Sequence, residues 1–182
     1  MPLAALPIES ERLRLRLVET DDLPALLRIH AVDEVTRFLP YTTWTGIADA
    51  QAWYARAVAR HEDGSALQFV IVEKATGEVV GTSLLFRFDT DSARAEVGYA
   101  LGRPHWGRGF MHEALGALIG FAFGTLALRR LEAEVDPRNL ASDRVLIRLG
   151  FTREGLLRQR WVAKGEAKDT HIYGLLRGEW SS

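Results

Sequence analysis

A turn with two closely spaced glycines, within His105 to Leu115 (HWGRGFMHEAL), is the segment of this sequence best suited to binding a ligand. A helix is expected to begin directly behind it. The first backbone N–H groups of a helix lack partners within the helix, and the helix dipole adds partial positive charge. Gly107 and Gly109 have no Cβ and leave the backbone open. The pattern predicts a phosphate or pyrophosphate site, with Arg103 and Arg108 adding charge nearby. A plain surface loop is an equally simple interpretation.

Two familiar phosphate-binding motifs fit this turn poorly. The dinucleotide fingerprint needs glycine at its first, third and sixth positions, whereas the series here is Gly107, Gly109 and His112. Glu132 or Glu134 supplies the acidic residue expected about 20 residues later, so this interpretation stays open as a minor one. The sequence contains no Gly-Lys-Ser/Thr, which excludes a P-loop.

The composition of the chain restricts its chemistry further. The 182 residues are 47% hydrophobic and 26% charged, which is typical of one globular domain spanning residues 1–182. The formal net charge of -1 and the absence of a Lys/Arg run argue against nucleic-acid and membrane partners. There is no cysteine, which excludes disulfides, thiolate metal sites and cysteine nucleophiles. The N-terminus lacks the features of a signal peptide, so we expect a cytoplasmic protein.

Two sequence patterns could suggest a metal site or a membrane span, but each has a simpler structural explanation. His61-Glu62 and His112-Glu113 lack the second histidine of a zinc helix, so no metal site is predicted. Residues 114–128 contain no charge, but this segment is too short for a bilayer span. Its glycines recur every four residues and could form a membrane dimerisation face. We expect instead a buried helix whose glycine side, Gly116, Gly120 and Gly124, lies against a sheet.

The segments around the turn predict a mixed α/β (α+β) fold. Alternating Leu and Arg at 13–17 predict a half-buried strand, and residues 68–88 predict two strands joined at Thr76-Gly77. Further strands are expected at 93–102, 129–136, 151–157 and 169–177, the last two around a polar loop, and helices at 20–30, 48–61, 110–128 and 139–149. The last helix is expected to end at Gly150 in a left-handed cap. This order predicts a mostly antiparallel sheet of about seven strands, with a parallel part in the middle and about four helices.

Taken together, the sequence resembles the GNAT acetyltransferases, and within them the ribosomal-protein N-terminal acetyltransferases (RimJ/RimL type). The resemblance runs nearly end to end, and it includes Asn139-x-x-Ser142 before Gly150-Phe151. The matching segments are SERLRLRLVETDD, DEVTRFLP, AEVGYALGRPHWGRGFMHEAL, NLASDRVLIRLGFTREG and KDTHIYGLLRGEW. The resemblance implies the GNAT fold with splayed central parallel strands, and acetyl-CoA as co-substrate without a metal.

The resemblance assigns the glycine turn to the pyrophosphate of coenzyme A. The residues of this turn are Trp106, Gly107, Arg108, Gly109, Phe110 and Met111. The family's loop normally ends in glycine or alanine, and this chain departs from that pattern at Met111. The backbone of Tyr99, Ala100 and Leu101 would pair with the pantetheine arm where two parallel strands splay apart. Tyr99 is equally compatible with a core or rim aromatic.

The resemblance also indicates the catalytic groups. Glu96, on the strand before the turn, stands where several family members carry a catalytic glutamate; a surface glutamate paired with Arg94 or unpaired is the alternative. Leu146 occupies the position where many relatives carry a catalytic tyrosine, and Ser142 is the candidate that replaces it as acid or thiolate stabiliser. Asn139 would contact the pantetheine arm. Ser142 and Asn139 are also good helix N-caps.

Three functions follow from these assignments. The first is acetyl transfer by direct attack to the α-amine of a protein or peptide N-terminus, whose pKa near 8 would let a water relay or solvent take its proton. The second is acetylation of a small amine such as a polyamine, an amino acid or an aminoglycoside, and the third is a non-catalytic coenzyme A sensor. A homodimer is compatible with the sequence. Aromatic residues that could wall an acceptor groove are Phe38, Tyr41, Trp44, Trp53, Phe86, Phe88 and Trp161. Acidic residues that would favour a polycation are Glu62, Asp63, Asp89 and Asp91.

Overall fold

The computed structural model describes residues 7–181 and is built around one eight-stranded sheet. The strand order is β1-β2-β3-β4-β5-β6-β8-β7. The strands are β1 (Ile8–Glu9), β2 (Leu13–Leu17), β3 (Ala66–Glu73), β4 (Val79–Asp89), β5 (Arg94–Leu101), β6 (Arg130–Val135), β7 (Thr152–Ala163) and β8 (Glu166–Leu176). The mixed fold is therefore confirmed, with one strand more than the number predicted.

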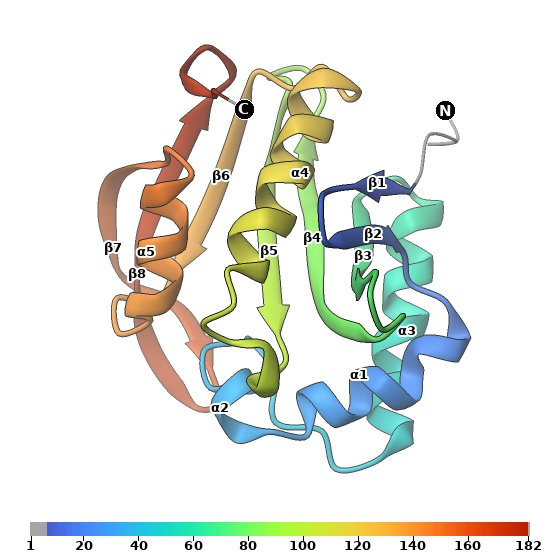
Figure 1. Ribbon diagram of the computed structural model, residues 1–182. Coiled ribbons are helices and arrows are strands. Elements are labelled where there is room, and N and C mark those ends of the chain that lie inside the picture. Colours follow the sequence, from blue (N-terminus) through green and yellow to red (C-terminus); the bar gives the residue numbers. More distant parts are fainter. Residues whose placement is uncertain (1–6, 182) are drawn as a thin grey trace.

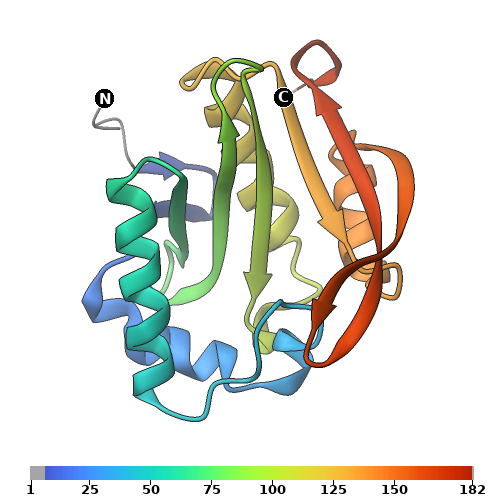
Figure 2. The same ribbon diagram turned by 180° about the vertical axis from the view of Figure 1, so that it is seen from behind.

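Helices cover both faces of the sheet. The five α-helices of the described residues are α1 (Leu23–His30), α2 (Asp33–Thr36), α3 (Ile47–Glu62), α4 (Phe110–Gly124) and α5 (Leu140–Arg148). Short 3-10 turns lie at Thr20–Asp22, Arg103–His105 and Arg177–Glu179. Figure 1 shows α4 and α5 in front of the sheet, and Figure 2, from behind, shows α1 and α3 on the opposite face. No helix of residues 7–181 is long and apolar enough to cross a membrane.

The central strands β5 and β6 form the parallel pair, and this pair is short. Their register joins Arg94 to Arg130, Ala95 to Leu131 and Glu96 to Glu132, and the pairing ends there. The two strands then diverge toward their carboxyl ends (Figure 1). All other neighbouring strands pair antiparallel. The predicted splay of central parallel strands is confirmed, and it leaves backbone N–H and C=O groups beyond Glu96 without a partner in β6.

The α4 helix packs its large apolar side chains against the sheet, turns Gly120 and Gly124 outward and leaves Gly116 half-buried beside Leu149 and Trp180. Leu115, Leu118 and Ile119 are buried, in the same core cluster as the sheet residue Phe69. Gly120 and Gly124 are exposed, and a Cβ built on either would meet nothing within 4 Å. The expectation that the glycine side faces the sheet was therefore wrong. Small residues permit close packing but do not require it, and burial of larger apolar surface determined the orientation of this helix.

The C-terminal strands are longer than the sequence patterns predicted. β7 and β8 continue through the segment expected to be a polar loop, and they meet at a tight turn in which Lys164 and Gly165 have φ of 55° and 77°. All of β7 except its last residue is exposed, because it is the edge strand. An exposed strand needs no apolar alternation, so its polar sequence does not distinguish it from a loop. The expected cap at Gly150 is present, with φ of 87°.

Candidate active site

Glu96 lies at the last paired position of β5, where the splay begins. Its side chain is on the α3 face of the sheet, opposite Phe86 of β4 in the register, and the residue is only 8% exposed. Burial raises the pKa of Glu96 to about 7, against the lowering effect of the adjacent Arg87 guanidinium. A carboxyl group with this pKa is suited to accept a proton near neutral pH. The alternative of a surface glutamate paired with Arg94 does not hold, because Glu96 is buried and Arg94 binds Glu132 instead.

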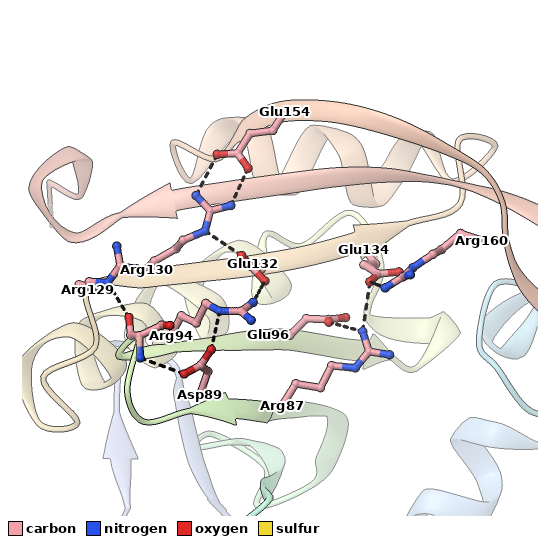
Figure 3. Close-up of polar contacts among 11 residues, drawn as sticks. Arg87, Asp89, Arg94, Glu96, Arg129, Arg130, Glu132, Glu134, Glu154 and Arg160 are labelled. Atoms are coloured by element: carbon pink, nitrogen blue, oxygen red, sulfur yellow. Dashed lines mark hydrogen bonds and ion pairs between the residues drawn. The ribbon is translucent and has the colours of Figure 1, made fainter.

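Arg87 connects Glu96 to a second carboxylate. Its Nη1 lies 2.7 Å from Glu96 Oε2 and 3.1 Å from Glu134 Oε1 (Figure 3). Glu134 also accepts a hydrogen bond from the indole N–H of Trp161, and Arg160 Nη2 lies 3.4 Å from Glu134 Oε1. Strands β4, β5, β6 and β7 thus each contribute to one polar cluster beside the splay.

Sequence reasoning missed Arg87 because its position depends on an irregularity. The β4–β5 register shifts between Phe86 and Asp89, and Arg87 has φ of 52°. A β-bulge of this kind redirects a side chain, and bulges occur often beside active sites. Positive φ is uncommon for residues other than glycine, and nothing in the residue type arginine indicates it.

A second pair of polar groups lies on the opposite face of the sheet. Tyr99 is three residues after Glu96 on β5, so its side chain points to the α4 face. Its hydroxyl oxygen lies 2.6 Å from Ser142 Oγ, near the start of α5. Ser142 is 9% exposed. The structure therefore brings together two of the predicted site residues, and it places the carboxyl and the hydroxyl groups on the two faces of the sheet at the splay.

Asn139 is the N-cap of α5, and its side-chain oxygen accepts a hydrogen bond from the Ser142 N–H over 3.2 Å. The capping alternative thus holds for Asn139. It does not hold for the Ser142 side chain, whose hydroxyl bonds Tyr99 instead. The cap fixes the backbone of Ser142 and, with it, the position of the hydroxyl group.

The remaining backbone candidates for the pantetheine arm are Ala100 and Leu101. Both lie on β5 beyond the last pair with β6. Consecutive strand residues direct their backbone groups to opposite sides, and the Ala100 carbonyl lies beside Gly81 of β4, so it is Leu101 that faces the gap between the splayed strands. The Leu101 carbonyl is partly engaged, because the Trp106 indole N–H donates to it over 2.7 Å. Trp106 is half exposed and holds the turn against the end of the strand.

The glycine turn has the conformation that its sequence suggested. Gly107 and Gly109 have φ of 76° and 77°, and Gly109 is the N-cap of α4. A Cβ built on Gly107 would meet nothing within 4 Å, so a ligand can approach the backbone there. Phe110 and Met111 are buried in the core. The Met111 side chain, where the chain departs from the family pattern, therefore points away from the approach to the turn.

Two arginines flank this turn. Arg108 Nη2 lies 2.6 Å from Glu73 Oε1, and its guanidinium stacks 4.2 Å from the centre of the Phe110 ring. Arg12, which sequence reasoning did not single out, donates to the Arg108 carbonyl over 3.0 Å and to Glu113 over 2.7 Å. Arg12 lies far from the turn in the sequence. The packing of β2 against α4 brings it there, and the sequence alone does not predict that packing.

The aromatic residues proposed for the acceptor side are divided between core and site. Tyr41, Trp44 and Trp53 gather around the buried His30. Phe86 and Trp161 lie at the polar cluster; Phe88 packs against the core on the α4 side, and Phe38 stacks with Arg37.

Two of the acidic residues that would favour a polycationic acceptor lie on different elements and already have partners. Asp89 pairs with Arg94 at the end of β4 that lies away from the splay, and Asp63 accepts from the Ser65 N–H. Within residues 7–181 no group of three or more His, Asp or Glu side chains is placed to hold a metal ion.

Comparisons with known proteins agree with this geometry. A family model described as an acetyltransferase (GNAT) domain matches residues 12–152. The "Uncharacterized N-acetyltransferase p20" of Bacillus licheniformis is 39% identical over 94% of this chain and 97% of its own length. The [ribosomal protein uS5]-alanine N-acetyltransferase of Escherichia coli is 29% identical over 96% of this chain and 92% of its own. Among solved structures, a GNAT-family acetyltransferase from Bacillus anthracis has the same fold, with a TM-score of 0.86 at 22% identity over 96% of this chain and all of the other.

Proposed function

Because the chain belongs to the GNAT acetyltransferase family, whose members use acetyl-CoA as co-substrate, we propose that it transfers acetyl by direct attack to a protein or peptide N-terminal α-amine. The observation that supports this most strongly is the buried Glu96 carboxyl at the splay, with a pKa of about 7. Ribosomal-protein acetyltransferases among the relatives support the choice of acceptor.

The residues of this chain fit the co-substrate. The N-terminus of α4, with Gly107 open to approach, would hold the pyrophosphate. The backbone groups of Tyr99 to Leu101 that face the gap, and have no partner in β6, would bind the amides of the pantetheine arm. Acetyl-CoA supplies an activated acyl group as a thioester, and this group would lie at the splay.

Glu96 would then take a proton from the acceptor ammonium, directly or through water, so that the amine can attack the acetyl carbon. On the other face, the Ser142 hydroxyl would donate a hydrogen bond to the departing thiolate. Tyr99 would hold that hydroxyl in place, since its pKa is raised by burial and it keeps its own proton. No cysteine is present, so the acetyl group passes directly to the amine without an acyl-cysteine step. A base and a thiolate partner on opposite faces favour catalysis over a coenzyme A sensor.

A thiol-release assay tests this proposal. Acetyl-CoA is supplied with N-terminal peptides, the same peptides with blocked α-amines, and small amines such as spermidine and free amino acids. We expect free-amine peptides to give the largest kcat/KM and blocked peptides to give none. Turnover with small amines alone would contradict the choice of acceptor, and binding of acetyl-CoA without turnover on any amine would support the sensor function.

A further inference from the structure

The sheet face that carries Glu96 is open between α3 and the β7–β8 hairpin. Figure 2 shows no helix of residues 7–181 over β5 and β6 on this side, while α1 packs against β4. In the register, Leu84 lies opposite Gly98, and Phe86 lies opposite Glu96. The Leu84 and Phe86 side chains both lie within 4 Å of a Cβ built on Gly98. The floor beside Glu96, in the direction of α3, therefore carries the apolar side chains of Leu84 and Phe86.

This floor leads to a hollow at the edge of α3. The hollow has a volume of about 30 Å³, and Leu84 forms the wall nearest to Glu96. Trp53, Arg56 and Arg60 line it from α3, and Gln68 lines it from β3. Hence two arginine side chains line the hollow at the end of an apolar path that begins beside Glu96.

Neither of these arginines forms a salt bridge among residues 7–181, whereas Arg87 and Arg160 both pair with Glu134. Arg60 is nevertheless close enough to Asp63 to add to the hydrogen bonds from Ser65 in lowering the pKa of that carboxyl. Arg56 and Arg60 are exposed and one helical turn apart, so their side chains are neighbours. Two neighbouring guanidinium groups can bind a carboxylate from both sides.

The distance from Glu96 indicates which part of an acceptor would reach the arginines. Glu96 is opposite Phe86, and Phe86 is opposite Ala66, which also lines the hollow. Two strand spacings amount to about 10 Å, and an extended peptide rises about 3.3 Å per residue. With its α-amine at Glu96, a peptide would therefore place its third or fourth residue at the hollow.

We propose that Arg56 and Arg60 form a binding site for an acidic side chain at the third or fourth position of the acceptor peptide. This inference rests on the proposed peptide function and adds a substrate class to it. The acceptor is an N-terminus whose first residues pass over Leu84 and Phe86 and whose following residues are acidic.

The test compares peptides that share their first two residues and carry Glu, Gln or Lys at positions 3 and 4. We expect kcat/KM to fall in that order, with Glu preferred over Gln roughly fivefold at low salt, as two exposed ion pairs would give. High salt should reduce the preference, because it screens exposed charges. The Arg56→Gln/Arg60→Gln double variant should lose the preference, while Arg56→Lys/Arg60→Lys keeps part of it.

Arg144→Gln is the matched control, because Arg144 is exposed on α5 at the other face of the sheet and its loss should leave the preference unchanged. Equal rates for the three peptides with wild-type protein, or a preference for Glu that survives in the double variant, would overturn the acidic site. If the double variant does not fold, equal rates for the three peptides with the wild type would still overturn the acidic site. Acetylation of the Gln peptide separately tests the proposed function: if no peptide is acetylated, the peptide acceptor itself is wrong.

Discussion

The hydroxyl oxygens of Tyr99 and Ser142 lie 2.6 Å apart and connect β5, one of the two splayed strands, to α5. Ser142 cannot serve merely as a cap, since Asn139 performs that function through its own side chain. The pair lies on the face opposite Glu96. A proton acceptor and a hydrogen-bond donor are thereby separated by the strand at which the acyl group would be held.

The first prediction concerns this pair. Ser142→Ala should lower kcat roughly ten- to a hundredfold and change acetyl-CoA affinity much less, because the lost donor acts on the departing thiolate. Tyr99→Phe should lower kcat by a smaller factor, because the Ser142 hydroxyl remains but is no longer held. Steady-state kinetics and thermal melts on the same preparations measure both effects.

Tyr173→Phe provides the control for the tyrosine variant. The Tyr173 hydroxyl, on β8, donates to Asp143 of α5 over 2.8 Å, so this variant also loses a hydrogen bond between a strand tyrosine and α5. It should lower stability without lowering kcat. If Tyr99→Phe behaves in the same way, the Tyr99–Ser142 contact is structural only.

The second prediction concerns the pH dependence set by Glu96. A base with a pKa of about 7 is protonated below that pH, so kcat/KM should fall as the pH drops through about 7. Arg87 lowers the pKa of Glu96 by its charge and its hydrogen bond, so Arg87→Gln should move the acidic limb of the profile to higher pH. Arg160→Gln, which removes a contact to Glu134 and not to Glu96, should move it less. An acidic limb unchanged in both Arg87→Gln and Glu96→Gln would exclude Glu96 as the base.

The third prediction separates anion binding from backbone strain in the glycine turn. Gly107 and Gly77 have φ of 76° and 74°, and a Cβ on either would meet nothing within 4 Å. Alanine at either position should therefore lower stability by a similar amount, about 1 kcal/mol. Gly107→Ala alone should weaken acetyl-CoA binding, because its methyl group occupies the approach to the α4 N-terminus. Equal acetyl-CoA affinities of the two variants, measured by calorimetry, would show that the pyrophosphate does not bind at this turn.

Local sequence patterns predicted most of the strands and helices, whereas the candidate site residues other than the glycine turn came from the family resemblance. Leu-Arg alternation identified β2, and the order of strand, glycine turn and helix placed Glu96 and the turn correctly relative to each other. Contacts between distant segments were not predictable. The Tyr99–Ser142 bond depends on where α5 packs, and the Arg87–Glu134 contact depends on a bulge in β4.

The direction of the α4 glycines shows the same limit at the level of packing. A period of four places Gly116, Gly120 and Gly124 on one face but does not say which face is buried. The larger apolar residues on the other side of α4 bury more apolar surface than the glycines would, and this side therefore faces the sheet. Likewise, β7 has no apolar pattern because both of its faces touch solvent.

The last prediction concerns His30, which is completely buried among Tyr41, Trp44 and Trp53. Burial lowers the pKa of His30 from 6.5 to about 4, so the folded protein holds this imidazole neutral while the unfolded chain protonates it below pH 6.5. The stabilisation is complete above pH 6.5 and is lost as the pH falls toward 4. One pKa unit corresponds to about 1.4 kcal/mol, so His30 should remove about 2 kcal/mol from the free energy of unfolding by about pH 5.

Denaturant unfolding of wild type and His30→Phe across this pH range isolates the effect. Glu96 acts in the opposite direction, because its folded pKa is raised from 4.5 to about 7 and its contribution to stability therefore grows as the pH falls through that interval. Both proteins contain Glu96, so the difference between them reports His30 alone. Phenylalanine keeps the aromatic packing and removes Nε2, which is buried without a hydrogen-bond partner among the described residues. The wild type should therefore lose more stability than the variant between about pH 7 and pH 5, and parallel curves would show that the imidazole does not titrate with folding.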